Sequence, residues 1–219
     1  MSKTLVLLHT APSNVTTFAR LLAELDPSIP AKHVLDESLL QEARVTGITP
    51  ELEQRIQQRL LDETGANTAI VLCTCSTIGG SAERSHAANG QGVIRVDRPM
   101  AEAAVAAGDR IIVAAALEST IAPTTELIQD VAASQGREVT VRPLLCEGAW
   151  QRFEQGDQAG YWQSVAETLR GEALDADVIV LAQASMAGAA DLLRDHPLPI
   201  LSSPRMGLQA AIHAFHAAP

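Results

Sequence analysis

Hydrophobic runs of strand length alternate along the chain with longer segments whose apolar positions recur at helical spacing. This pattern predicts eight strands: Thr4–His9, Lys32–Leu35, Thr68–Thr74, Gly92–Val96, Arg110–Ala116, Val139–Leu145, Val178–Gln183 and Pro199–Ser202. It predicts nine helices: Asn14–Leu25, Thr49–Thr64, Gly80–Asn89, Pro99–Ala107, Thr120–Ser134, Ala149–Gln155, Gln158–Ala173, Gly188–Arg194 and Met206–Ala217. Strands and helices in this order predict a parallel α/β fold with right-handed connections.

Polar residues mark several expected boundaries between these elements. Thr49 followed by Pro50 is typical of a helix start. Thr120 or Thr124 is expected to cap the helix that follows the fifth strand. The residues 36–38, Asp-Glu-Ser, are expected to form a polar loop after the second strand.

One motif occurs twice in the chain. The run Ile70–Leu72 is followed by small polar residues and glycine, and so is the run Ile179–Leu181. Counted from the two runs, Cys75 falls opposite Ala184. The repeat divides the strands four and four. It therefore predicts two pseudosymmetric lobes, residues 1–98 with 206–219 and residues 99–205, each a small parallel sheet flanked by helices. The active site is expected in the cleft between them.

Composition narrows the function classes. The chain of 219 residues is 47% hydrophobic but only 3% aromatic, which favours helices packed on a parallel sheet over an all-β fold. A formal net charge of -10 argues against nucleic-acid binding. No apolar run is long enough to cross a membrane, and the first residues resemble a strand and not a signal peptide.

Three cysteines, Cys73, Cys75 and Cys146, form an odd set that fits a reducing compartment, so we expect a cytoplasmic protein. Their spacing matches no standard metal site, and no metal is expected. Cys75 lies at the carboxyl end of a predicted strand, where open α/β sheets bind ligands, and is the candidate functional thiol. Cys73 and Cys146 are interpreted as packing residues. His9 is interpreted as a structural, hydrogen-bonded residue.

Several motifs resemble those of one enzyme superfamily. Cys75-Ser76-Thr77 resembles the Cys-Asn-Thr signature of aspartate/glutamate racemases. The segment Leu181–Ala187 is similar to the Leu-Gly-Cys-Ala-Gly-Met-Ala step of hydantoin racemases. Together with the Asp-x-Pro-Met-Ala-Glu motif at Asp97–Glu102, they make the chain resemble the Asp/Glu/hydantoin racemase superfamily over nearly its full length.

The resemblance implies a cofactor-independent enzyme that acts on a small carboxylate-bearing substrate, with a homodimer as the implied assembly. Typical members place one cysteine on each side of the substrate, and the two thiols exchange a proton at the carbon alpha to the carboxylate. Cys75 matches the first position. A thiolate near a helix amino end is stabilised by the helix dipole, and the same amide groups can hold a carboxylate.

The chain departs from this pattern at the second position. Gln183 or Ala184 occupies it, depending on register, and neither is an acid or base at neutral pH. Glu147, after the strand that ends at Leu145, is the candidate for a second catalytic group. A one-thiol decarboxylase or lyase, an isomerase with a nucleophilic cysteine, and a binding protein with a vestigial site remain alternatives. The remaining expected substrate-binding residues are Thr10, Ser76, Thr77, Thr120, Gln183, Ala184, Ser185 and Met186.

Overall fold

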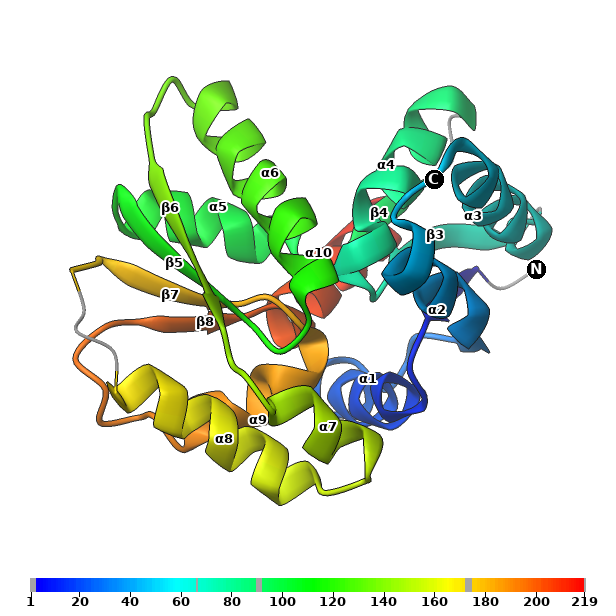
Figure 1. Ribbon diagram of the computed structural model, residues 1–219. Helices are drawn as coiled ribbons and strands as arrows, with labels where there is room; N and C mark the ends of the chain where they lie inside the picture. Colours follow the sequence, from blue (N-terminus) through cyan, green and yellow to red (C-terminus); the bar gives the residue numbers. More distant parts are fainter. Residues whose placement is uncertain (1–2, 66, 90–91, 172–174, 219) are drawn as a thin grey trace. The chain divides into compact units, whose positions relative to one another are not determined.

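The computed structural model describes residues 3–65, 67–89, 92–171 and 175–218, and these residues form two compact units (Figure 1). Unit 1 contains the described residues up to Arg98 and those from Pro204 onward. Unit 2 runs from Pro99 to Ser203.

Unit 1 is built on a four-stranded sheet in the order β2-β1-β3-β4, with every neighbouring pair parallel. Its strands are β1 (Thr4–His9), β2 (Ala31–Leu35), β3 (Thr68–Cys73) and β4 (Val93–Arg95). Its helices are α1 (Pro12–Leu25), α2 (Glu37–Thr46), α3 (Pro50–Glu63), α4 (Ser76–Asn89) and, from Pro204, α10 (Ser203–Ala217).

Unit 2 is built on a second four-stranded parallel sheet, in the order β6-β5-β7-β8. Its strands are β5 (Arg110–Ala115), β6 (Thr140–Leu145), β7 (Val178–Leu181) and β8 (Ile200–Ser202). Its helices are α5 (Arg98–Ala107), α6 (Glu118–Ser134), α7 (Ala149–Glu154), α8 (Gln158–Gly171), the short 3-10 turn η1 (Ala184–Met186) and α9 (Ala187–Asp191).

The two sheets share one topology. In each, the first strand of the repeat pairs with the second on one side and the third on the other, and the fourth lies at the edge beyond the third. The predicted α/β class, with two four-stranded parallel sheets flanked by helices, is confirmed. Because all strands of a unit are parallel, their carboxyl ends lie along one edge of each sheet, where ligands bind in folds of this class.

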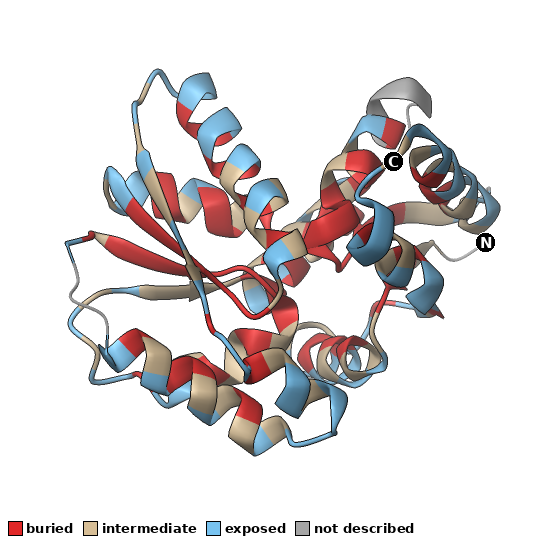
Figure 2. Cartoon of the chain, in the orientation of Figure 1, coloured by how far each residue is buried: buried red, intermediate tan, exposed pale blue. Residues whose placement is uncertain are grey.

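The core of unit 1 forms because the strands present apolar side chains on both faces. Val6 and Leu8 of β1 pack with buried residues of α2, α3 and α4, whereas the alternate residues of β1 point to the other face. Arg205 of α10 pairs with Glu24 of α1, which ties the end of the chain to the first helix. Figure 2 shows that the central strands are mostly buried, whereas the edge strand β2 and the outer helix surfaces are largely exposed.

In unit 2, helices cover both faces of the sheet (Figure 1). Ile112 and Ile179 belong to a core that also contains Tyr161 and Val165 of α8. Aromatic side chains are scarce in the chain, so this core is filled mainly by Ala, Val, Leu and Ile. Gly188 in α9 is required at its position because a Cβ there would overlap the indole ring of Trp162.

The structure corrects several predicted boundaries. The predicted loop at residues 36–38 is wrong: Asp36 directly precedes α2, whose two buried residues, Leu39 and Ala43, are too few to give a clear helical pattern. Helix α6 begins at Glu118, so the predicted capping by Thr120 or Thr124 is wrong and both lie inside the helix. Helix α4 begins at Ser76 and not at its glycines. The predicted end of α8 at Ala173 lies outside the described residues.

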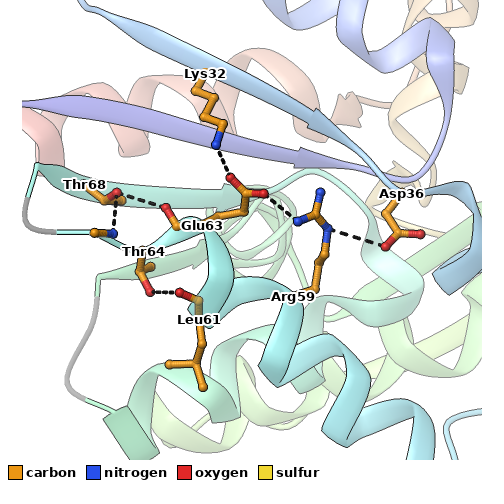
Figure 3. Close-up of polar contacts among 8 residues, drawn as sticks. Lys32, Asp36, Arg59, Leu61, Glu63, Thr64 and Thr68 are labelled. Carbon is orange, nitrogen blue, oxygen red and sulfur yellow. Dashed lines mark hydrogen bonds and ion pairs between the residues drawn. The ribbon is translucent and has the colours of Figure 1, made fainter.

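An ion-pair network joins the edge strand β2 to α3 (Figure 3). The carboxylate of Glu63 accepts hydrogen bonds from Lys32 of β2 and from Arg59, one turn earlier in α3. Arg59 also lies 3.5 Å from the carboxylate of Asp36. These contacts lower the pKa of Glu63, with the hydrogen bond from Lys32 as the largest cause. The network fixes the carboxyl end of β2 against α3.

No helix within the described residues is long and apolar enough to cross a membrane.

Candidate functional site

Cys75 lies in the connection between β3 and α4, immediately before the first residue of the helix. Its sulfur accepts hydrogen bonds from the hydroxyl of Thr10 and from the backbone N–H groups of Thr77 and Ile78. The two N–H groups belong to the first turn of α4, where backbone donors have no partner within the helix. Cys75 therefore occupies the N-cap position, with sulfur in the place usually taken by a side-chain oxygen.

The surroundings of Cys75 act on its protonation in opposite directions. The residue is 8% exposed, and burial raises the pKa of its thiol above the ordinary value. Hydrogen bonds from Thr10, Ile78 and Thr77 lower this pKa, and the negative charge of Asp97 raises it. The raised pKa differs from the expectation of a thiolate at neutral pH. The resting group is a thiol, and three donors are already placed to stabilise the thiolate when a proton leaves.

A buried ion pair lies beside the same helix start. The guanidinium of Arg95 donates to both carboxylate oxygens of Asp97, at 2.7 and 3.0 Å, and both side chains are almost fully buried. A Cβ on Gly79 would lie only 3.0 Å from the Nε of Arg95, so glycine allows the guanidinium to pack against the first turns of α4. Arg95 therefore holds the carboxylate of Asp97 in a fixed position, where its negative charge acts on Cys75.

Two histidines hold the residue that precedes Cys75. The hydroxyl of Thr74 donates to the backbone oxygen of Leu8 at 3.0 Å, so its oxygen accepts from the Nδ1–H of His9 at 2.8 Å. The Nε2 of His9 then accepts from the Nδ1–H of His33 at 2.9 Å. Burial, followed by the neighbouring His33, lowers the pKa of His9 to about 3. His9 is thus neutral with a fixed tautomer, which supports its interpretation as a structural residue.

Other polar residues gather at the same edge of unit 1. Thr10 and Asn14 are buried, and the Nδ2 of Asn14 lies 3.4 Å from the backbone oxygen of Thr74. Ser76 is buried, and its hydroxyl has no hydrogen-bond partner among the described residues. Of the expected binding residues, the structure therefore brings Thr10, Ser76 and Thr77 together around Cys75.

The matching strand end of unit 2, after β7, carries no thiol. Gln183 follows β7 and is 9% exposed. Its Oε1 accepts from the backbone N–H of Ala116 at 2.8 Å, and its Nε2 is buried with no partner among the described residues. Thr120 is buried in the first turns of α6, and Ala184 is a buried alanine in η1. This strand end offers hydrogen-bond donors, and neither Ala184, which the repeat aligns with Cys75, nor Gln183 is an acid or a base.

Two of the expected binding residues, Met186 and Ser185, have side chains that contact the interior of unit 2. Met186 has no exposed surface and packs in the hydrophobic core with Tyr161, so its expected place in the site depends on its backbone and not on its side chain. The hydroxyl of Ser185 lies 3.0 Å from that of Tyr161, and its backbone oxygen accepts from the indole N–H of Trp162. Ser185 thus anchors η1 on α8.

Glu147 does not have the environment that a second catalytic acid needs. Its side chain is exposed in the turn that follows β6, whereas the expected role required burial. Its neighbour Cys146 is fully buried, and burial raises the pKa of this thiol to about 11. Burial likewise raises the pKa of Cys73 to about 12. Cys146 and Cys73 lie in the cores of unit 2 and unit 1, as packing residues do.

Within the described ranges, no group of three or more His, Cys, Asp or Glu side chains is arranged to hold a metal ion. Sequence reasoning missed His33, Asn14 and Arg95 as parts of the site in unit 1. The ion pair of Arg95 could have been predicted from the sequence, because Arg95 lies two residues before Asp97 and its guanidinium can bind both carboxylate oxygens. The roles of His33 and Asn14 depend on the pairing of β2 with β1 and on the angle of α1, which no local pattern contains.

No protein-family model matches the chain, and no curated protein sequence matches it. Several solved structures have a fold similar to that of the chain. A glutamate racemase of Francisella tularensis in complex with D-glutamate has a TM-score of 0.72 at 14% identity, over 99% of this chain and 82% of the racemase. An aspartate racemase of Picrophilus torridus has a TM-score of 0.69 at 12% identity, over 98% and 95%. An arylmalonate decarboxylase has a TM-score of 0.57 at 16% identity, over 97% and 92%.

These similarities span almost the whole chain at low identity, so they establish the fold alone. The chain has the α/β fold of these racemases and this decarboxylase, and the fold implied by the sequence motifs is confirmed.

Proposed function

We propose that the protein is a cofactor-independent enzyme, an isomerase or a lyase but not a two-thiol racemase, that moves a proton on one face of the carbon alpha to a carboxylate. Cys75 is the proposed catalytic residue. The observation that carries the proposal is the N-cap position of its thiol, which accepts from Thr10 and from two backbone N–H groups of α4.

The chemistry follows from that position. When Cys75 gives a proton to a carbanion, the sulfur becomes negative and the three donors stabilise it without rearrangement. In the reverse direction the thiolate takes a proton from the carbon alpha to the carboxylate, and the electron pair of the C–H bond moves onto the carboxylate as an enediolate. Fold relatives that act on glutamate and aspartate support a small carboxylate as the substrate.

The proposal specifies one proton-transferring group and not two. Gln183 and Ala184 stand where the second thiol of a two-thiol racemase is expected, and neither is an acid or base at neutral pH. Glu147 is exposed and is left out of the proposed site. Proton exchange on one face of the substrate is therefore the reaction that this residue set supports best.

A second candidate is decarboxylation. The raised pKa of Cys75 suits a proton donor, and a decarboxylase has the same fold. In this reaction one carboxylate leaves as CO2, the bonding electrons remain on the carbon, the Cys75 thiol protonates that carbon, and water returns a proton to the thiolate. Loss of CO2 needs no acid on the opposite face, which the alanine at position 184 fits.

One experiment tests both reactions. The protein is incubated in deuterated water with each enantiomer of aspartate and glutamate, and with methylmalonate and phenylmalonate. Mass spectrometry then follows deuterium at the alpha carbon, and CO2 release is measured in parallel. Deuterium incorporation or CO2 release that disappears in Cys75→Ser and persists in Cys146→Ser supports the proposal. Equal rates in the unaltered protein and in Cys75→Ser would refute it.

A further inference from the structure

The outermost strand of the sheet in unit 1, β2, has an open edge. The backbone N–H of Asp36 donates to the backbone oxygen of His9 at 2.8 Å, which fixes the phase of the pairing with β1. Because the backbone groups of successive residues in a strand point to opposite sides, the even-numbered residues of β2 face β1. Ala31, His33 and Leu35 therefore direct their N–H and C=O groups away from β1, where the described residues place no further strand.

The other edge strands of the two sheets are protected against strand addition. β4 and β8 are only three residues long. In β6 the N–H of Thr140 donates to the backbone oxygen of Asp109, which turns the odd-numbered residues to the open side. One of these is Pro143, which has no N–H to offer a neighbouring strand. Short edges and prolines prevent unwanted strand pairing, whereas β2 is five residues long and contains no proline.

The side chains of β2 do not oppose a neighbour. Lys32 is the one lysine or arginine of this strand, and its ammonium is held by Glu63 of α3, away from the role of a free edge charge (Figure 3). Burial lowers the pKa of His33, so this residue is neutral near pH 7. Leu35 is 41% exposed, an unusual place for a large apolar side chain. A second strand at this edge would cover apolar surface without bringing like charges together.

The strand is also complementary to itself. If two copies of β2 run antiparallel about a twofold axis at His33, Ala31 lies opposite the partner's Leu35, and Leu35 opposite the partner's Ala31. Each outward-facing residue then exchanges both of its backbone hydrogen bonds with the residue opposite. Lys32 lies opposite the partner's Val34, so no two lysines face each other. Pro30 faces β1, where its missing N–H does not affect the new pairing.

We propose that β2 pairs antiparallel with β2 of a second copy of this chain, so that the sheets of two units 1 become one continuous sheet. The inference concerns an interaction surface and is independent of the chemistry proposed for Cys75. It places the dimer axis at His33, whose Nδ1–H donates to His9. Dimer formation therefore covers the outer end of the hydrogen bonds that hold Thr74.

Engineered cysteines test the register of this pairing. In the double variant Ala31→Cys/Leu35→Cys, each introduced thiol faces one of the partner, across residue pairs whose Cα atoms lie about 5.5 Å apart and can be joined by a disulfide. Within one chain the two positions are about 13 Å apart and cannot be joined. Air oxidation should therefore give a covalent dimer on non-reducing gel electrophoresis.

Val141→Cys/Leu145→Cys is the matched control. It has the same spacing on the open side of β6, where Pro143 interrupts the row of donors, and it should remain a monomer on the same gel. Circular dichroism checks that both double variants are folded.

Sedimentation velocity of the unaltered protein at increasing concentrations measures self-association without a crosslink, and a dimer is expected. Ala31→Pro removes one outward-facing N–H from each copy and should weaken the dimer about tenfold or more. The inference is overturned if the unaltered protein stays monomeric, or if the folded Ala31→Cys/Leu35→Cys variant crosslinks no better than the control. An unchanged dissociation constant in Ala31→Pro would also overturn it. None of these results bears on deuterium exchange or CO2 release, which test the function proposed for Cys75.

Discussion

The Nδ1 atom of His9 lies 2.8 Å from the hydroxyl oxygen of Thr74, the residue that directly precedes Cys75. Because the Thr74 hydroxyl donates to Leu8, this contact requires a hydrogen on Nδ1 and a neutral imidazole whose Nε2 accepts from His33. The end of β3 is thus held by a buried chain of hydrogen bonds that reaches across β1 to the edge strand β2. The chain of contacts fixes the backbone that presents the thiol.

Replacing His9 should change how stability depends on pH. Burial and His33 lower the pKa of His9 from 6.5 to about 3, so between these values the unfolded chain binds a proton that the folded protein excludes. Stability from this group is complete above pH 6.5 and falls as the pH decreases, by up to about 1.4 kcal/mol per pH unit. In His9→Gln, the free energy of unfolding between pH 6.5 and 4 should fall less steeply. Urea unfolding at several pH values measures it, and an unchanged slope would contradict this account.

Cys75→Ser should lower turnover by about 10²–10⁴-fold, the usual contribution of a positioned acid or base, because a hydroxyl is far less acidic than a thiol. The fold should persist, since the oxygen can accept from the same N–H groups of α4. Cys146→Ser, in the core of unit 2, is the control for the general effect of losing a thiol. Comparable losses of turnover in the two variants would show that the cysteines matter for packing and not for chemistry.

Removing the charge of Asp97 should change the pKa of the Cys75 thiol measurably. Its carboxylate raises the pKa of the thiol, so Asp97→Asn should shift the midpoint of Cys75 alkylation to lower pH. Arg95→Met removes the cation and leaves that carboxylate unpaired, and should shift the midpoint to higher pH. Both variants lose the same buried ion pair and should be destabilised, about 3–5 kcal/mol for a broken buried pair. Alkylation followed by mass spectrometry reads the midpoint, and shifts in the same direction would contradict the electrostatic argument.

Glu63→Gln should weaken the ion-pair contact between β2 and α3. The pKa of Glu63 is lowered mainly by its hydrogen bond from Lys32, so its contribution to stability is present above about pH 4.5 and is lost as the pH falls. Near neutral pH the variant should melt about 2–4 °C lower, and the difference should vanish in acid. Asp62, the residue before Glu63 in α3, is exposed and accepts a hydrogen bond from Gln58, so Asp62→Asn should have a smaller effect. A difference in melting temperature that persists in acid would contradict the assignment.

The sequence predicted the sheets well because parallel, buried strands are continuous apolar runs bounded by polar residues. β1 is found at its predicted bounds, and β5 one residue shorter at its end. Helix α2 was missed because its buried residues are few and its start, at Asp36 and Glu37, is as polar as a loop. The division of the strands into two sheets of four followed from the repeat of the Ile-Val-Leu run.

The site was predictable only in part. The position of Cys75 followed from the abrupt end of an apolar run, but its protonation depends on burial and on Thr10, Thr77 and Ile78, which meet it only in the folded unit. The unpaired NH2 of Gln183 depends on a contact with Ala116, 67 residues earlier. The direction of the Met186 side chain could not be predicted, because a residue after a strand end points to the ligand edge or into the core according to the turn it occupies, and here the side chain lies in the core.

The central claim is that one thiol, on one side of the substrate, moves the proton. The stereochemical course of exchange tests it most directly: each enantiomer of an amino acid that exchanges is incubated separately in deuterated water, and label and configuration are followed together by mass spectrometry and chiral chromatography. The account predicts that deuterium enters the alpha carbon of one enantiomer with its configuration retained, and that Cys75→Ser abolishes this exchange. Rapid interconversion of the two enantiomers, with label entering both at equal rates, would contradict it.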